Sequence, residues 1–413
     1  MLSNPARADE VATSASSVRL RLGLVGAGVR GGQHAATIAG LPDLYEFVAV
    51  CDVNEARAQA MAQRYTIHAY GGLGEFFARE RLDAVLIAVP GDVHHVVAKA
   101  AADHHVHMLI EVPLAFTRAM MDVIEEAAAK AGVYVEVGEN YGRRPAELLN
   151  RQVLRDGLIG KLVHLSFFNG PANHHTMSLF RFYAEADVTE VHAFPRRVAL
   201  DPKVSGLDAE RWTEAMVTFE NGVIGTTSYV SSWTAPFRWG RPRFATLDGT
   251  AGYIVSTSEG ENHLGRVEEN GPFHYELTVI SRSVENRERE RDETPTRFFY
   301  STTPPMEVVS PFADRVLADA EPGSICDGLG RADELLSLHR SITTGAPARF
   351  GTAYTRRSQE IAIAIHESAR LGKPLAATLG EETGWEREQH ELFEQKRGAH
   401  PLKDVDAIIK GSR

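Results

Sequence analysis

Four side chains in the middle of the chain are suited to moving protons at neutral pH. Glu139 and Tyr141 are separated by one residue, and His174 and His175 are adjacent. Tyrosine and histidine act as general acids or bases when their surroundings bring their pKa values near neutrality. We therefore predict that these residues form a catalytic group. Structural roles remain open for each residue. One of the two histidines could only pack or cap a helix, Tyr141 could be a half-buried aromatic ring, and Glu139 could bond backbone amides.

A glycine-rich turn near the N-terminus predicts a site for a diphosphate. Gly26, Gly28 and Gly31 follow an apolar run and precede a helix-like stretch. The first glycine permits the tight turn, the second lets the backbone approach a pyrophosphate, and the third allows a helix to pack closely on a strand. The anion would lie at the N-terminus of that helix, beside Val29 and Arg30, where backbone N–H groups and the helix dipole favour negative charge.

An acidic residue after the next apolar run extends this pattern. Asp52 is placed to bind a ribose, and its carboxylate would repel a 2′-phosphate, so the predicted cofactor is NAD rather than NADP. Arg57 could turn back towards a phosphate, although a solvated helix charge is the simpler interpretation. Pro90 and His94 follow a later strand and are placed to flank the nicotinamide ribose. The alternative for His94 is a helix-start residue beside the cleft.

The elements that would position these residues alternate between strand and helix patterns. Apolar runs at residues 20–25, 47–51, 84–89, 106–110 and 133–137 predict buried parallel strands, and the stretches 54–64, 93–103 and 118–131 predict helices between them. Repeated strand–helix units predict a doubly wound parallel sheet of the Rossmann type, with helices on both faces, and hence the α/β class. We assign residues 19–140 to this NAD-binding domain.

A second, α+β domain is predicted for residues 141–375, with a role in binding substrate and partner subunits. We expect a helix at 146–156 and strands at 162–168, 215–219, 223–230 and 243–248, with a hairpin turn at residues 220–222. The sheet is expected to be open and mostly antiparallel, and the polar segment 259–296 to be an excursion or mobile loop. Residues 1–18 are predicted to be a disordered lead and residues 376–413 a charged, partly helical tail.

Composition restricts the classes of function. The chain has 413 residues, a net charge of −11 and two cysteines, Cys51 and Cys326, far apart in the sequence. The negative charge argues against broad nucleic-acid binding, and no apolar run approaches the ~20 residues of a membrane span. The cysteines predict neither a disulfide framework nor a metal site, which fits a reducing cytoplasm. We expect a cytoplasmic protein that binds a small molecule and no metal.

The chain resembles the glucose–fructose oxidoreductase / inositol dehydrogenase / MocA family from about residue 19 to residue 170. The resemblance rests on the glycine turn, Val89-Pro90, Glu111-Val112-Pro113 and Gly138-Glu139-Asn140-Tyr141, and it returns weakly at 217–228 and 365–374. It implies an NAD site that includes Glu111 and Pro113. It also implies a second domain whose open sheet covers a carbohydrate substrate and often takes part in an oligomer interface, so a homo-oligomer (a dimer or tetramer) is expected.

Two departures from the family pattern bear on the chemistry. The usual catalytic lysine would fall at Val112, and the usual Asp-x-x-x-His pair near residues 170–175, where His175 matches the family histidine but no aspartate lies four residues before it. A subset of the family, the NAD-dependent glycosidases, keeps Glu-Val-Pro and a Glu-Asn sequence with a tyrosine nearby. That closer resemblance implies a glycoside hydrolase that oxidises carbon 3 of the sugar, eliminates the glycosidic bond, adds water and reduces the ketone again.

Two other functions remain open. The second hypothesis is an ordinary NAD-dependent sugar or polyol dehydrogenase or reductase with a different acid–base residue. The third is a non-catalytic sensor of NAD and sugar, because the usual catalytic set is incomplete.

An arginine- and tryptophan-rich segment predicts the substrate contacts. Trp233, Arg238, Trp239 and Arg241 lie close together, and Arg143 follows the Glu139–Tyr141 motif. Guanidinium groups bind sulfonates and carboxylates through paired hydrogen bonds, so an anionic sugar such as a sulfoquinovoside is the specific expectation. An oligomer interface is an equal alternative, because tryptophan and arginine are also enriched there.

Overall fold

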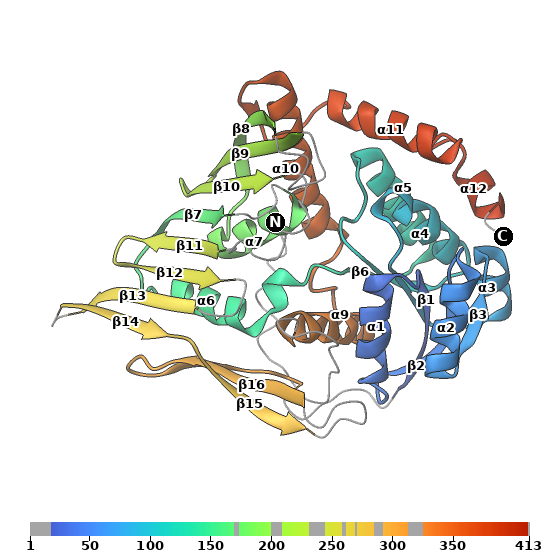
Figure 1. The fold of residues 1–413 in the computed structure, drawn as a ribbon, viewed down its shortest axis with the longest axis horizontal. Helices are drawn as coiled ribbons and strands as arrows, with labels where there is room; N and C mark the ends of the chain where they lie inside the picture. The colour runs from blue at the N-terminus through green and yellow to red at the C-terminus, as the bar shows by residue number, and fades with distance from the viewer. Residues whose placement is uncertain are drawn as a thin grey trace.

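The computed structural model describes residues 18–168, 173–199, 209–230, 244–257, 262–268, 271–284, 292–312 and 325–411. These residues form two large sheets with helices packed against them and a small third sheet. Figure 1 shows the N-terminal sheet and the second sheet on opposite sides of the molecule, with helices α9 (Ile325–Thr344) and α10 (Thr352–Leu371) between them.

The N-terminal domain is a parallel sheet in the order β3-β2-β1-β4-β5-β6. Its strands are β1 (Leu20–Val25), β2 (Tyr45–Cys51), β3 (His68–Tyr70), β4 (Ala84–Ile87), β5 (His107–Ile110) and β6 (Val135–Val137). Its helices are α1 (Val29–Ala39), α2 (Glu55–Tyr65), α3 (Leu73–Arg79), the short 3-10 turn η2 (Gly91–Val93), α4 (His94–Asp103) and α5 (Arg118–Ala131). The strand order reverses between β1 and β4, and open sheets of this kind bind ligands beyond the carboxyl ends of the strands at such a point.

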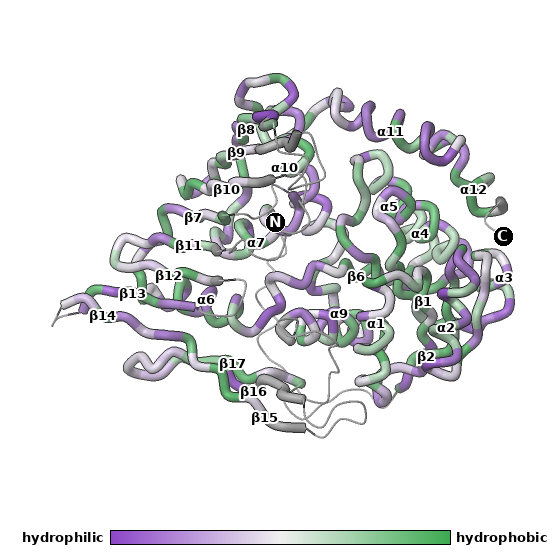
Figure 2. The backbone as a smooth tube through the Cα atoms, in the orientation of Figure 1, coloured by the Kyte–Doolittle hydropathy of each residue, from purple (hydrophilic) through white to green (hydrophobic). Residues whose placement is uncertain are grey.

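The apolar runs form these strands because helices cover both faces of the sheet. Every residue of β4 is buried, and in β1 only Arg21 is partly exposed. Figure 2 shows hydrophobic residues along β1, in the middle of the domain. The predicted Rossmann fold is therefore confirmed.

The second domain is built on a nine-stranded sheet in the order β14-β13-β12-β11-β7-β10-β9-β8-β18. The strands are β7 (Leu162–Phe168), β8 (Val188–Ala199), β9 (Ala209–Phe219), β10 (Ile224–Val230), β11 (Phe244–Gly249), β12 (Gly252–Thr257), β13 (Asn262–Glu268), β14 (Gly271–Glu276) and β18 (Leu375–Ala376). Strands β7 and β10 run parallel and the other described neighbours are antiparallel. The expected open, mostly antiparallel sheet is confirmed, as is the hairpin between β9 and β10, where Gly222 has a φ of +83°.

One face of this sheet packs against helices and the other is open. Helix α7 (His174–Ala184) contacts β7 and helix α10 contacts β8, while α6 (Pro145–Arg155) lies beside α7. Leu165, Val217 and Ala193 are buried, whereas Met216 and Phe194 on the alternate positions of their strands are exposed. This alternation with a period of two is typical of a sheet with one covered face.

The expectation of a loop at residues 259–296 is wrong for the part that the structure describes. That part contains β13, β14, β15 (Thr278–Val284) and the start of β16 (Asp292–Tyr300), and β15, β16 and β17 (Met306–Val309) form the third sheet. Most residues of β14 are exposed. The backbone N–H and C=O groups of β14 pair with those of β13 independently of the side chains, so a polar segment can still form a strand here.

The C-terminal part returns to the first domain. Helices α11 (Gly384–Arg397) and α12 (Val405–Gly411) run along the outer side of the Rossmann domain in Figure 1, past α5 and towards α4. Among the described residues, no helix is both long enough and apolar enough to span a membrane.

Candidate active site

The glycine turn fits the diphosphate of a dinucleotide. Gly26 has a φ of +104°, and a Cβ on Gly31 would lie 1.9 Å from the Gly26 carbonyl oxygen, so α1 approaches the turn closely only because both residues are glycine. Space is open around Gly28, the N-cap residue of α1, and among the described residues no side chain caps this helix end. The first-turn amides of α1 therefore suit a bound anion. Val29, the first residue of α1, is 86% exposed.

Asp52 lies at the carboxyl end of β2, beside the glycine turn. Its Oδ2 accepts a hydrogen bond from the Ala27 N–H at 2.6 Å, and its Oδ1 accepts one from the Asn54 N–H at 2.7 Å. Each oxygen of a carboxylate can accept a second hydrogen bond. Asp52 thus holds the turn in place, and the predicted ribose contact is compatible with that role.

His94 links the two loops that follow β4 and β5. Its Nδ1 lies 2.8 Å from the Pro113 carbonyl oxygen and its Nε2 lies 3.0 Å from the Val89 carbonyl oxygen. Burial lowers the pKa of His94, and the neutral ring donates to one of these carbonyls at a time. His94 is also the first residue of α4, with Pro90 before η2. The contact of Pro90 and His94 with the nicotinamide ribose stays a prediction.

Glu111 is a buried anchor between the loop after β5 and helix α1. Arg30 Nε and His34 Nε2 each lie 2.5 Å from Glu111 Oε1. Burial alone would raise the pKa of Glu111, but the charge of Arg30 and the hydrogen bond with His34 outweigh burial and the pKa is lowered. Burial lowers the pKa of His34 to about 4. Glu111 and Arg30, both predicted to bind the cofactor, thus hold each other, and the adjacent Val112 packs partly buried against the core.

A second acidic group, Glu334 on α9, lies close to this anchor. Ligand atoms of His34, Glu111 and Glu334 lie within 4.8 Å of one another. Burial and the charge of Glu111 raise the pKa of Glu334 to about 8, while Arg143, Arg30 and Arg331 act against that shift. These arginines already supply positive charge to the two carboxyl groups, so a divalent ion would add uncompensated charge to a buried cluster. We assign no metal to it.

Glu139, Tyr141 and His175 come together at one place, although they lie on separate elements. His175 Nδ1 lies 3.1 Å from Glu139 Oε1, and the Tyr141 ring stacks on the imidazole with centroids 4.5 Å apart and planes 12° apart. The carboxylate favours the tautomer with its proton on Nδ1, which leaves Nε2 to accept a proton. Glu139 also accepts the Tyr141 N–H at 3.2 Å. It therefore bonds a backbone amide and orients His175 at the same time.

Helix α7 positions both histidines. Asn173 caps its N-terminus by accepting the His175 N–H at 3.1 Å, and the two rings lie 4.4 Å apart. Burial lowers the pKa of His174 well below its usual value, and the nearby Glu111 and His94 also act on it electrostatically. His174 is thus neutral and lies towards the cofactor loops. Its Nε2 has no hydrogen-bond partner among the residues that the structure describes.

Asn140 is a residue that the sequence reasoning missed. It is 4% exposed, and its Oδ1 lacks a hydrogen-bond partner within the described ranges. Buried polar atoms are almost always paired, so the unpaired atoms of Asn140 and His174 fit a bound molecule that bonds to them. The Glu-Asn-Tyr motif contained Asn140, but nothing in the residue pattern distinguished its amide from a structural one.

The prediction that Arg143 binds substrate is corrected by its surroundings. Its guanidinium is fully buried: Nε donates to the Glu139 carbonyl oxygen at 2.9 Å, Nη1 to Asp333 at 2.8 Å and Nη2 to Glu136 at 2.5 Å. The ring of Phe350 covers it at 4.7 Å. No face is left for a ligand, and Arg143 instead holds the backbone that carries Glu139. The other predicted substrate residues, Trp233, Arg238, Trp239 and Arg241, lie outside the described residues.

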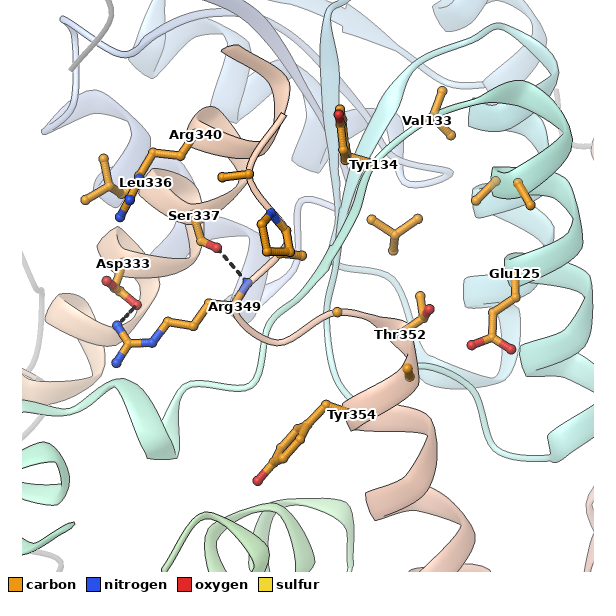
Figure 3. A pocket seen from close by; sticks show the side chains of 18 of the residues that line it. Glu125, Val133, Tyr134, Asp333, Leu336, Ser337, Arg340, Arg349, Thr352 and Tyr354 are labelled. Atoms are coloured by element: carbon orange, nitrogen blue, oxygen red, sulfur yellow. Dashed lines mark hydrogen bonds and ion pairs between the residues drawn. The ribbon is translucent and has the colours of Figure 1, made fainter. Parts of the chain in front are cut away.

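A cavity of about 750 Å³ lies apart from this group, between α5, β6 and α9 (Figure 3). Tyr134, Leu336 and Arg340 are among its lining residues, and none of the described residues predicted for catalysis or cofactor binding lines it. At its wall Arg349 pairs with Asp333 at 2.9 Å. Asp333 also holds Arg143, which joins the cavity wall to the backbone of Glu139.

Comparison with known proteins agrees with the geometry of the first domain. Residues 20–139 match the model of the GFO_IDH_MocA family, described as an oxidoreductase family with an NAD-binding Rossmann fold. An inositol 2-dehydrogenase from Salmonella typhimurium is 32% identical over 157 residues, which are 36% of this chain and 46% of that protein. A glycosyl hydrolase family 109 protein from Shewanella amazonensis is 32% identical over 160 residues, which are 35% of this chain and 34% of that protein. The matched region thus spans less than half the length of these curated relatives.

Solved structures share the whole architecture. An oxidoreductase from Agrobacterium radiobacter in complex with NAD+, L-tartaric acid and magnesium has a TM-score of 0.65 at 17% identity, covering 87% of this chain and 99% of its own. A levoglucosan dehydrogenase in complex with NADH has a TM-score of 0.65 at 19% identity, covering 88% of this chain and 100% of its own. At these identities the likeness establishes the fold. Residues 20–139 thus match the NAD-binding Rossmann domain of the GFO_IDH_MocA oxidoreductase family.

Proposed function

We propose that the protein is an NAD-dependent glycoside hydrolase that oxidises, cleaves and re-reduces its sugar at one site. The observation that supports this proposal is the Glu139–His175 pair with Tyr141 stacked on the imidazole. Val112 stands where the family usually has its lysine, and an apolar side chain cannot exchange a proton. Elimination of a glycosidic bond needs both a base and an acid, and His175 and Tyr141 offer one of each.

In this proposal the residues divide the proton transfers. A bound NAD would supply hydride chemistry at carbon 3 of the sugar, taking the hydride and returning it at the end of the cycle, while the proton of the carbon-3 hydroxyl would pass to water and come back with the hydride. His175 Nε2 removes the proton from carbon 2 after the ketone has made it acidic, and the Glu139 charge stabilises the resulting imidazolium. Tyr141 gives its hydroxyl proton to the departing glycosidic oxygen. Neutral His174 suits a hydrogen bond to the sugar or the cofactor better than a proton transfer.

An ordinary sugar or polyol dehydrogenase is the second candidate. Oxidation of an alcohol needs one base beside the cofactor, and the Glu139–His175 pair alone meets that need. The relatives named as inositol dehydrogenases match this chain as well as those named as glycosyl hydrolases. The two candidates differ in the fate of the hydride, because a hydrolase of this kind retains NADH and a dehydrogenase accumulates it.

The test is a panel of aryl α- and β-glycosides, neutral and anionic, incubated with NAD in heavy water. The proposal predicts release of the phenol without accumulation of NADH, and deuterium at carbon 2 of the freed sugar. Stoichiometric NADH formation from free sugars or polyols would favour the dehydrogenase instead. No turnover of either kind would leave a sensor of NAD and sugar. The anionic glycosides are included because the arginine- and tryptophan-rich segment, Trp233 to Arg241, predicts an anionic sugar.

A further inference from the structure

The C-terminal helices hold a loop of the cofactor cleft from outside. The C-terminal arm (residues 384–411, α11 and α12) starts from the second domain. There the Trp385 ring stacks on His366 at 4.9 Å, and the Trp385 backbone N–H donates to Glu367 at 3.0 Å. It then crosses to the Rossmann domain. Arg118, at the start of α5, pairs with Glu386 at 2.7 Å, and Thr117 lies 2.8 Å from His390 Nε2.

Asp92 is the point where this arm reaches the cofactor cleft. The residue belongs to η2, directly after the loop that leaves β4. Its carboxylate accepts from Lys396 Nζ at 2.8 Å and from Arg397 Nη2 at 3.0 and 3.1 Å. Burial alone would raise the pKa of Asp92, but Lys396 and Arg397 outweigh it and the pKa is lowered. Asp92 has 7% of its surface exposed, and the partly exposed Lys396 and Arg397 reach it from α11.

The loop after β4, which leads to Asp92, packs directly against the glycine turn. A Cβ on Gly26 would lie 2.4 Å from the Ala88 carbonyl oxygen and 3.1 Å from Val89 N, so backbone touches backbone there. The next residues lead to Asp92, and His94 ties the same loop to Pro113. A displacement of η2 therefore moves the loop against which the diphosphate turn is built.

Further contacts fix the arm beyond Asp92. Phe393 is buried and its ring lies 5.8 Å from His95. His95 Nε2 lies 2.9 Å from the Pro401 carbonyl oxygen, and Lys99 on α4 pairs with Asp406 on α12 at 2.8 Å. The C-terminal arm thus contacts η2 and α4 at several points along the arm. The residues that we assign to catalysis lie elsewhere.

We propose that the C-terminal arm is a clamp that retains the bound cofactor, with Asp92 as its positioning residue. The arm keeps the loop after β4 closed against the glycine turn and so slows the dissociation of the dinucleotide. This function is independent of whether the reaction is hydrolysis or oxidation. A reaction cycle that regenerates its own NAD gains most from slow release.

The test compares the dissociation of NADH from purified full-length variants. Asp92→Asn removes the charge at the loop, and Lys396→Ala/Arg397→Ala removes its partners. The matched control is Arg387→Ala/Lys403→Ala, which deletes two positive charges from exposed positions of the same arm. NADH is bound first, and its fluorescence is followed after rapid mixing with a large excess of NAD. Thermal unfolding and circular dichroism verify that each variant is folded.

We expect NADH to leave both Asp92→Asn and the Lys396/Arg397 variant at least ten times faster than the wild type, and the control at the wild-type rate. Combining Asp92→Asn with the Lys396/Arg397 changes should add little, since each breaks the same contact. Equal dissociation rates in all proteins would overturn the proposal. So would equal acceleration in the control, because the effect would then come from net charge and not from the contact with Asp92. Neither outcome depends on the reaction catalysed.

Discussion

At the scale of single residues, the candidate chemistry depends on His175 and its two neighbours. The loss of an acid–base group costs roughly 10²–10⁴-fold in rate, so we expect His175→Ala and Tyr141→Phe each to lower turnover by that range. Glu139→Gln should lower turnover and leave the NAD dissociation constant unchanged, because Glu139 orients the imidazole. His68→Ala and Tyr134→Phe, at exposed positions, are the matched controls. Steady-state kinetics with an accepted glycoside measure these effects, and wild-type turnover in His175→Ala would exclude the assigned role.

A second prediction at this scale concerns Glu334 and the pH dependence of stability. Its pKa is raised from 4.5 to about 8 on folding, so the folded state holds the proton more tightly and stability falls as pH rises through that interval. The pKa of His34 is lowered from 6.5 to about 4, which makes stability rise with pH up to about 6.5 and offsets the first effect there. The free energy of unfolding should therefore fall between pH 6.5 and 8, with a slope of at most about 1.4 kcal/mol per pH unit.

Glu334→Gln should flatten that slope, whereas Glu75→Gln at an exposed helix position should keep it. Urea unfolding at a series of pH values measures the free energy in each case. An unchanged slope in Glu334→Gln would mean that the buried carboxyl does not hold its proton at neutral pH.

At the scale of elements, the turn between β1 and α1 can be tested with neighbouring glycines. A Cβ on Gly31 would meet the Gly26 carbonyl oxygen at 1.9 Å, whereas a Cβ on Gly32 would meet nothing within 4 Å. Gly31→Ala should therefore push α1 away from the strand and weaken NAD binding at least tenfold. Gly32→Ala should bind NAD normally and gain about 1 kcal/mol of stability from helix propensity. Titration of NADH fluorescence and thermal unfolding distinguish the two, and equal behaviour would contradict this account of the turn.

A helix or strand can be predicted from the sequence when its own residues determine it, and it is missed when distant segments determine it. Five of the six parallel strands were readable because burial on both faces demands continuous apolar runs, as in β4. The short edge strand β3 was missed, since none of its three residues is buried. Strand β8 and the strands within 259–296 were missed, because pairing with neighbouring strands stabilises them through backbone hydrogen bonds that leave polar side chains in water. In the site, Glu139, Tyr141 and His175 were chosen by residue type. The burial of Arg143 was not readable, because Glu136 and Asp333 come from elements far apart in sequence.

At the scale of the whole molecule, the open face of the nine-stranded sheet favours self-association. Phe194, Met216 and Ile224 on adjacent strands β8, β9 and β10 are 54%, 39% and 41% exposed. Hydroxyl-bearing side chains lie among them, with Ser166 Oγ 2.8 Å from Thr246 Oγ1 on β7 and β11. Exposed apolar groups gathered on one face commonly mark an interface.

We therefore expect a dimer or tetramer joined through this face. Met216→Glu places a charge in its middle and should shift the protein towards monomer, as measured by sedimentation velocity over a range of concentrations. Leu392→Glu is the matched control, because Leu392 is an exposed apolar residue on α11, away from the sheet. The expectation fails if the wild type sediments as a monomer at every concentration. Should Leu392→Glu dissociate the assembly and Met216→Glu leave it intact, the interface would lie on the side of the C-terminal arm instead.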